Sequence, residues 1–407
     1  MLVSIFFRSG FRCFGSGFVN SNKNILRYPL LIVFVGAIIC SCSSSKPFSS
    51  RSAEPGIPAI RFLDEFVIPH NLLYDGTLVG GLSGIDYDSI RDRYFLISDD
   101  RSFTGPARFY TAKISLKAFK IDTVFFTSVS QMTQPDGTVF PSFKQDAKKT
   151  PDPESIRYHP INNSLIWTSE GDRELRAGKM NCRDPYIYEM DLTGRFMDSF
   201  FVPKNFKTSE FEIGPRGNAV FEGSTFSLDY ASYFVCMEGP LYEDGPMPAF
   251  DYKGAPVRII KFDSKTKKPV AQFAYLSDGV AHAPNPSNGF YINGVDEIVS
   301  IGKNKFLVVE RSYSAGMHQN TIKIFLVDIS NATDVSSLSG LNTAKNFMPA
   351  TKKLLLNLDD LGRYIDNIEG ITMGPALPNG NRSILMVADN NFSDLQKTQV
   401  LLFEFTQ

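Results

Sequence analysis

The chain has 407 residues, enough for two or three average domains or for one large all-β domain. Its 42 Lys and Arg residues are balanced by 43 Asp and Glu residues, so no basic field is available for nucleic-acid phosphates, which argues against nucleic-acid binding. Hydrophobic residues make up 43% of the chain and aromatic residues 13%, a composition that is typical of a packed core and argues against disorder over most of the length.

The N-terminal segment has the layout of an export signal. Residues 1–41 carry four cations and no acid, and they end in an apolar run from Pro29 to Ile39. This run is too short to span a bilayer comfortably, and a Ser-rich stretch follows it in place of a charged stop-transfer flank. We therefore expect residues 1–41 to be a lipoprotein signal peptide and residues 42–58 to be a Ser/Pro-rich tether.

Two cysteines lie where the signal peptide would be cleaved. The segment from Ile39 to Cys42 is similar to a bacterial lipobox, in which a cysteine is acylated and becomes the mature N-terminus. Cys42 is the predicted lipidation site, because the bulky Ile38 and Ile39 directly precede Cys40. Ser43 takes the place of an acid after Cys42, which is similar to the sorting pattern of outer-membrane lipoproteins. We expect a monomer that is lipid-anchored in the bacterial cell envelope, at the outer membrane.

Beyond the tether, residues 59–407 are expected to form a single β-propeller domain, because one strand pattern recurs about every 70 residues. In each repeat a polar or acidic residue starts a strand, and a second, apolar strand ends in an acid. The five repeats start at Leu82–Ile85, Pro153–Ile156, Phe221–Ser224, Val295–Ile298 and Ile368–Ile371. Two more strand-like runs follow each hairpin, so each unit has four strands. Four-stranded units in a closed ring are typical of a β-propeller.

The repeat count gives five blades. A sixth blade is the alternative, if a long stretch between repeats hides a divergent unit. The fifth unit lacks a fourth strand before the chain ends, whereas an unassigned strand precedes the first unit. We predict that this N-terminal strand closes the ring, with Phe62–Val67 pairing with Gln399–Phe405.

Acids recur at the ends of the repeated hairpins. In an antiparallel hairpin the start of the first strand and the end of the second lie side by side, so these positions should share one rim of the ring. Ser83 holds one of the ten positions, and the other nine are the acids Asp99, Glu154, Glu170, Glu222, Glu238, Asp296, Glu310, Glu369 and Asp389. If these strands are the innermost ones, the nine acids converge on the mouth of the central channel.

So many neighbouring carboxylates require a compensating charge, because each like charge raises the pKa of the next. Hard cations such as Ca²⁺ bind carboxylate oxygens, so the nine acids are predicted metal ligands and Ca²⁺ is the expected cofactor. Glu154, Glu222 and Glu369 start their strands and precede small residues, and they are the predicted centre of the site. The alternative for each acid is a structural role, in which it accepts hydrogen bonds from the backbone of the adjacent blade.

Three arginines follow the second-strand acids. Arg101, Arg173 and Arg311 are expected either to pair with these acids or to present planar donors to a phosphate group. With the three glutamates of the predicted centre, they form the predicted catalytic set.

The repeated hairpins, the lipobox and the closing segment from Ile368 to Asn391 resemble the phytase-like family, which is described as having esterase-like activity. The resemblance covers the chain from Phe62 to Phe405. It implies an exported β-propeller whose repeated Glu and Asp residues carry phosphoester hydrolysis on a small phosphorylated or ester substrate. Ser83 departs from the acidic pattern in the first repeat.

Motifs for other hydrolytic mechanisms are absent from the sequence. It contains no Gly-x-Ser-x-Gly, no His-Glu-x-x-His and no P-loop, which disfavours serine esterases, zinc peptidases and nucleotide hydrolases. The expected function is that of an exported, metal-dependent phosphoester hydrolase of the phytase or phosphodiesterase type. The alternatives are a lactonase-type Ca²⁺-dependent hydrolase and a non-catalytic envelope propeller that binds a glycan or a protein.

Overall fold

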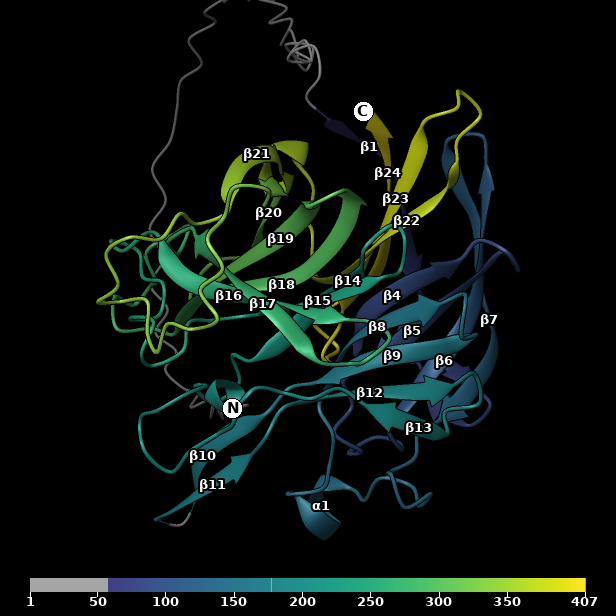
Figure 1. Ribbon diagram of the computed structural model, residues 1–407. Helices are drawn as coiled ribbons and strands as arrows, with labels where there is room; N and C mark the ends of the chain where they lie inside the picture. Colours follow the sequence, from purple (N-terminus) through teal and green to yellow (C-terminus); the bar gives the residue numbers. More distant parts are fainter. Residues whose placement is uncertain (1–57, 177, 407) are drawn as a thin grey trace, which may run out of the picture. The chain divides into compact units, whose positions relative to one another are not determined.

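Five antiparallel sheets of four strands each are arranged as the blades of a propeller (Figure 1). The computed structural model describes residues 58–406 except residue 177. The predicted signal peptide, the lipidation site Cys42 and the tether up to residue 57 lie outside these residues. Within them, no helix is long and apolar enough to cross a membrane.

The first four blades follow the chain, with the innermost strand first. Blade 1 contains β4 (Leu82–Asp88), β5 (Arg93–Ser98), β6 (Arg108–Lys117) and β7 (Lys120–Gln131). Blade 2 contains β8 (Pro153–His159), β9 (Ser164–Ser169), β12 (Tyr186–Asp191) and β13 (Phe196–Ser199). Blade 3 contains β14 (Phe221–Phe226), β15 (Ser232–Met237), β16 (Ala255–Asp263) and β17 (Pro269–Ser277). Blade 4 contains β18 (Tyr291–Gly302), β19 (Lys305–Ser314), β20 (Thr321–Asp328) and β21 (Thr351–Asn357).

Blade 5 joins the two ends of the domain. It contains β22 (Asn367–Ala376), β23 (Arg382–Asp389), β24 (Thr398–Thr406) and, as its outermost strand, β1 (Ala59–Ile68). Phe62 pairs with Phe403 and Val67 pairs with Gln399, which confirms the predicted ring closure. The predicted all-β propeller is also confirmed, with five blades rather than six.

Short elements decorate the ring. Two small hairpins are formed by β2 (Leu73–Tyr74) with β3 (Thr77–Leu78), and by β10 (Asp172–Arg176) with β11 (Lys179–Arg183). Helix α1 (Phe143–Asp146) lies in the connection between blades 1 and 2, and 3₁₀ turns span Lys204–Phe206 and Leu358–Leu361. The β10–β11 hairpin is inserted between the second and third strands of blade 2. It is therefore an addition to that blade's four-stranded plan.

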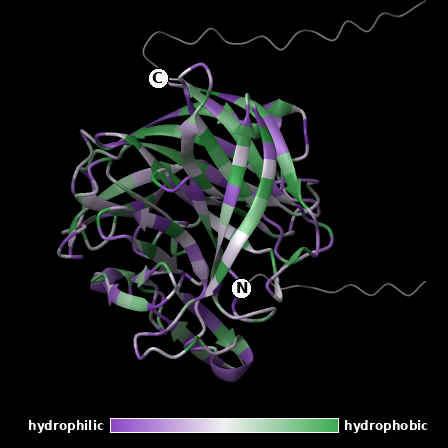
Figure 2. Cartoon of the chain, turned by 90° about the vertical axis from the view of Figure 1, so that its right-hand side faces the viewer, coloured by the Kyte–Doolittle hydropathy of each residue, from purple (hydrophilic) through white to green (hydrophobic). Residues whose placement is uncertain are grey.

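The hydrophobic core lies between neighbouring blades. In β19, Phe306 and Val308 pack in the cluster shared with blade 3, whereas Leu307 and Val309 pack in the cluster shared with blade 5. Successive side chains of a strand point to opposite faces of its sheet, and both faces of an inner blade strand are covered. This explains why such strands are continuous apolar runs, and Figure 2 shows hydrophobic residues concentrated along the strands.

The side chain of Arg157 extends from β8 into the centre of the ring. Its guanidinium donates hydrogen bonds to one backbone carbonyl in each of the other four blades, over 2.6–3.2 Å. The four acceptors occupy equivalent positions of the inner strands and are Ile85, Ser224, Ile298 and Ile371. The carboxylate of Glu297 pairs with the same guanidinium, and Asp86 lies 3.6 Å from it. One buried cation therefore ties all five inner strands together.

Replacing Arg157 with Met should remove these bonds and leave four buried carbonyls and the Glu297 carboxylate without their partner. Breaking a buried ion pair from one side typically costs about 3–5 kcal/mol. We expect a loss of this size in the free energy of unfolding, measured by urea denaturation. Arg195→Met is the control, because the Arg195 side chain is 77% exposed. Equal stability of the two variants would show that Arg157 does not tie the ring.

Candidate active site

Each inner strand has an irregularity in its ladder near its start. The ladders pass from Leu82 to Gly84, from Pro153 to Ile156, from Phe221 to Ser224, from Val295 to Glu297 and from Ile368 to Gly370. The skipped positions include Ser83, Glu154, Glu222, Asp296 and Glu369, which are the five first-strand positions of the predicted rim. A bulge leaves its extra residue unpaired and re-aims its side chain. These five side chains therefore lie at the same end of the channel.

The second-strand positions are set by the same ladders. The residue before each bulge pairs with Ser98, Ser169, Met237, Glu310 and Ala388 in blades 1 to 5. One residue further on, the equivalent positions are Asp99, Glu170, Glu238, Arg311 and Asp389. Blade 4 therefore contributes Arg311 to the rim where the sequence pattern predicted Glu310.

Glu310 lies outside the rim because successive side chains of a strand point to opposite faces. Its carboxylate accepts a hydrogen bond from the hydroxyl of Tyr275 and others from the backbone N–H of Asp278 (2.9 Å) and the Nδ2 of Asn293 (3.1 Å). Lys352 Nζ lies 2.8 Å from it. Glu310 is thus part of a structural network, and its predicted role as a metal ligand has no support from this placement.

The other eight predicted acids gather at the channel end, with one that the prediction omitted. We call this set of nine the acidic mouth, and its members are Asp99, Asp152, Glu154, Glu170, Glu222, Glu238, Asp296, Glu369 and Asp389. Three groups within it have carboxylate oxygens within 4.8 Å of one another: Asp99, Glu369 and Asp389; Asp152, Glu154 and Glu170; and Glu170, Glu222 and Glu238. The last two groups share Glu170, so the carboxylates form a nearly continuous arc.

Glu154, Glu222 and Glu369 do not form one centre. Each of them belongs to a different group of the acidic mouth. The bulges hold the three side chains at equivalent places around the ring, and each therefore meets the second-strand acid of its own or a neighbouring blade. The three glutamates that were predicted to share one centre therefore lie in three adjoining groups of carboxylates.

Asp152 is the member that sequence reasoning missed. The backbone N–H of Glu170 bonds to the carbonyl of Asp152, so Asp152 lies opposite Glu170 just before β8 begins. Asn367 holds the equivalent position in blade 5, and its side-chain amide donates to Glu369 over 2.7 Å. A polar residue at this position was the signal that could have identified Asp152 from the sequence. Only blades 2 and 5 carry one, so the signal does not recur with the repeat.

Arg311 is the cation inside the acidic mouth. Its guanidinium lies 2.9 Å from Asp296, 3.5 Å from Glu369 and 3.8 Å from Glu238. It also donates a hydrogen bond to the side-chain oxygen of Asn367. One arginine is thus shared among three carboxylates, so it offsets only part of their charge.

The other two predicted arginines differ in their placement. Arg101 pairs with Asp152 and donates to the side-chain oxygen of Asn218, so it lies at the edge of the acidic mouth. Arg173 donates to the backbone carbonyls of Ser209 and Glu210 and lies over the ring of Tyr242. The structure therefore does not bring Arg173 to the carboxylates, because the β10–β11 hairpin carries it to a neighbouring loop.

The small residues after the bulge positions serve the packing of the inner strands. A Cβ on Gly223 would lie 2.5 Å from the Cα of Glu297 in the next blade, and a Cβ on Gly84 would lie 2.7 Å from the carbonyl of Glu154. Ser155 bonds to the hydroxyl of Ser224 over 2.6 Å. The small size of these residues therefore allows the inner strands to approach one another, and protein atoms fill the space beside them.

Burial shifts the proton equilibria of the acidic mouth. It raises the pKa of Glu170 to about 7, helped by the nearby Asp152 carboxylate, and it raises the pKa of Asp389 to about 6. Burial is the main cause, and repulsion by neighbouring carboxylates the second, that holds the pKa of Glu154 and of Glu222 well above the usual range. The ionised mouth is therefore costly without further positive charge.

Two oxygens of the mouth show that the donor set suits a hard cation. Among the described residues, Glu238 Oε2 and Asp389 Oδ2 are buried and have no hydrogen-bond partner. Buried polar atoms without a partner are rare in folded proteins and call for a ligand or an ion. The donors here are carboxylate oxygens, which Ca²⁺ and Mg²⁺ prefer. The residues present therefore fit a divalent cation.

Comparison with family models gives one match. The model described as phytase-like, with the esterase-like activity of phytase, matches residues 77–392. This range includes all five inner strands and the whole acidic mouth. No curated protein matches the chain.

Several solved structures are similar in outline. The GH43 β-1,3-galactosidase BT3683 is 9% identical, with a TM-score of 0.44 over 82% of this chain and 93% of its own. The GH32 β-fructofuranosidase BmSUC1 of Bombyx mori is 10% identical, with a TM-score of 0.41 over 86% of this chain and 62% of its own. The gluconolactonase XC5397 of Xanthomonas campestris is 10% identical, with a TM-score of 0.33 over 87% and 99%. Similarity of this size does not extend to function.

The raised pKa values predict how stability depends on pH. The folded protein holds the proton of Glu170 up to about pH 7, whereas the unfolded chain releases it near 4.5. This contribution is fully present below pH 4.5 and is lost as the pH rises through 7. With chelator present, we expect the melting temperature to fall by roughly 5 °C over this range. Glu170→Gln should flatten the profile, and an unchanged profile in this variant would contradict the assignment.

Proposed function

The chain belongs to the phytase-like family, and we propose that it is an exported phosphoester hydrolase that uses divalent cations held in the acidic mouth. The observation that carries the proposal is the arc of carboxylates at one end of the ring, with buried oxygens of Glu238 and Asp389 left without partners among the described residues. Some acids of the mouth also accept backbone donors, as Glu170 does from Val220 and Asp389 does from Asn391, but within the described part of the chain these bonds leave the second oxygen of Asp389 without a donor.

The charge of the mouth supports a cation requirement. The mouth contains nine carboxylates, and their nearby positive charges include Arg311 inside the mouth and Arg101 at its edge. Ionised carboxylates at such separations repel one another, and that repulsion is relieved either by protons or by bound cations. At neutral pH the three groups of carboxylates would each hold a cation, with Ca²⁺ as the proposed ion.

The mouth also has the asymmetry that a hydrolytic site needs. Asp99, Glu154 and Glu369 are partly exposed, whereas Glu170, Glu238 and Asp389 are buried. Buried members would anchor the cations, and exposed members would face the substrate. When bound, a divalent cation polarises a phosphoryl group and offsets the charge that develops on it. Arg311 and Asn367 hold the side chain of Glu369 in place, which fixes the exposed rim without metal.

The placement of the chain terminus supports display from a membrane anchor. Asp389, at the end of β23, belongs to the acidic mouth, and β24 then runs from Thr398 away from it to Thr406. Ala59 pairs with Thr406, so the first strand of the domain begins at the end of the ring opposite the mouth. Figure 1 shows this end far from α1 and the β10–β11 hairpin.

A panel of phosphomonoesters, phosphodiesters and lactones, assayed with Ca²⁺ and with chelator, tests the proposal. We expect Ca²⁺-dependent phosphoester hydrolysis that falls at least about 100-fold in Glu222→Gln and Glu238→Gln, because oriented electrostatic groups contribute on this scale. Calcium should also raise the melting temperature of the wild type by mass action, and the rise should shrink in these variants.

Glu310→Gln is the matched control. It removes a buried carboxylate one residue away from the rim, so the size of the Ca²⁺-dependent rise should stay as in the wild type. Lactone turnover without phosphoester turnover would favour the lactonase alternative. A Ca²⁺ effect on stability with no turnover of any ester would favour a binding propeller, and no Ca²⁺ effect at all would refute the metal site.

Lipidation at Cys42 is tested separately. The full chain expressed with its N-terminal segment in a bacterial host should partition into the detergent phase and carry lipid at Cys42. Cys42→Ser should move the protein to the aqueous phase, while Cys40→Ser should leave partitioning unchanged. A Cys42→Ser protein that still enters the detergent phase would contradict the assignment.

A further inference from the structure

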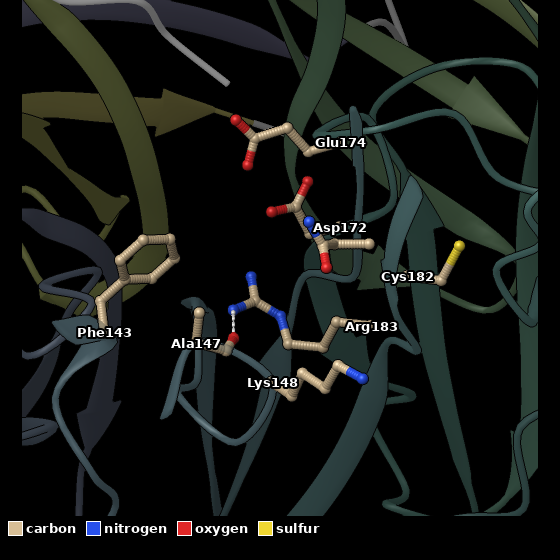
Figure 3. Close-up of a pocket in the computed structure, with 8 residues that line it drawn as sticks. Phe143, Ala147, Lys148, Asp172, Glu174, Cys182 and Arg183 are labelled. Carbon is tan, nitrogen blue, oxygen red and sulfur yellow. Dashed lines mark hydrogen bonds between the residues drawn. The ribbon is translucent and has the colours of Figure 1, made fainter. Parts of the chain in front are cut away.

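A cavity of about 160 Å³ lies beside the acidic mouth, between the β10–β11 hairpin and the segment that contains α1. Figure 3 shows the carboxylates of Asp172 and Glu174 and the guanidinium of Arg183 directed toward one opening, with the ring of Phe143 across from them. The cavity suits one part of a ligand rather than a whole drug-sized molecule.

Arg183 lines this cavity, and only part of its guanidinium is engaged by hydrogen bonds within the protein. The residue is 8% exposed, and its Nη1 donates to the carbonyls of Thr150 (2.7 Å) and Ala147 (3.3 Å). Within the described residues, its Nε and Nη2 are buried and have no hydrogen-bond partner. The guanidinium is thus held by two backbone carbonyls and by the Asp152 carboxylate, which lies 3.6 Å from Nη2, and among the residues that the structure describes its Nε keeps a buried donor without a partner beside the cavity. A buried donor of this kind is rare and indicates a place for a ligand.

The charges that line the cavity indicate the chemistry of its ligand. Asp172 and Glu174 are opposed by Arg183 and Lys148, so the lining is neutral overall. A hydroxyl both donates and accepts, so vicinal hydroxyls can bond to the carboxylates and to Arg183 together. A second phosphate group would instead meet two buried carboxylates. The aromatic face of Phe143 adds an apolar wall for a carbon skeleton.

The cavity adjoins the acidic mouth through Asp152. This residue belongs to the group with Glu154 and Glu170, and its carboxylate lies 3.6 Å from Arg183 Nη2. Asp172 follows Glu170 by two residues in the chain. A phosphoryl group at the mouth and an alcohol in the cavity would therefore be near neighbours.

We propose that this cavity is the subsite for the alcohol portion of the substrate, and that it selects phosphate esters of neutral, vicinally hydroxylated alcohols over densely phosphorylated ones. The predicted substrate selectivity rests on the proposed phosphoester hydrolase function. The binding of a neutral sugar to the cavity does not depend on turnover.

The first experiment measures the binding of D-glucose to the full-length protein by saturation-transfer difference NMR. We expect transfer to glucose in the wild type and in the surface variant Asp122→Asn, and its loss in Asp172→Asn. Asp172→Asn keeps the size of the side chain and removes its charge. Absence of transfer in the wild type, or equal transfer in all three proteins, would overturn the subsite whatever the enzyme hydrolyses.

The kinetic arm compares glucose 1-phosphate, ethyl phosphate and inositol hexakisphosphate with Ca²⁺ present. We expect glucose 1-phosphate to be preferred over both. The kcat/KM ratio of glucose 1-phosphate to ethyl phosphate should fall about tenfold in Asp172→Asn, as expected for one lost charged hydrogen bond. No turnover of any phosphoester together with glucose binding would refute the proposed hydrolase and keep the cavity as a sugar site. Preference for inositol hexakisphosphate would overturn the selectivity.

Discussion

Five inner strands approach one another closely around a single buried guanidinium, and the geometry of the acidic mouth follows from that approach. Arg157 bonds to equivalent carbonyls in the four other blades. Strands can meet at this distance only where side chains are small, as Gly84 and Gly223 are. At or next to these positions every inner ladder is interrupted by a bulge, and in four of the five blades the displaced residue is an acid of the mouth.

The carboxylates of the mouth repel one another, and the free energy gained by packing the rest of the domain offsets this repulsion. Extensive burial of apolar side chains between the blades holds the carboxylates together, although burial raises the pKa of several of them. Arg311 relieves three of these acids, and Arg101 and Arg183 pair with Asp152, but the nine carboxylates still outnumber these three arginines. That imbalance is what makes the site suited to divalent cations, because a cation with several oxygen ligands offsets more charge than one guanidinium can.

The repeat pattern predicted most residues of the acidic mouth, and its errors fall at positions where one blade differs from the others. Eight of the nine acids were identified, since a hairpin places both of its ends on one rim. Glu310 was misplaced because the register of β19 against β18 cannot be read from an apolar run, and an error of one residue moves a side chain to the other face. Asp152 was missed because only blades 2 and 5 carry a polar residue at that position. Arg173 was misplaced because the inserted hairpin β10–β11 redirects it.

The amino-acid sequence by itself determined the five four-stranded units and the closure of the ring by the first strand. These depend on strand patterns of local origin and on a count of strands. Only the tertiary structure decided that Arg157 fills the centre, that Arg311 replaces an acid in blade 4, and that a cavity opens beside Asp152. Each of these requires contacts between residues that are far apart in the chain, and their distances depend on how bulges and insertions bring the blades together.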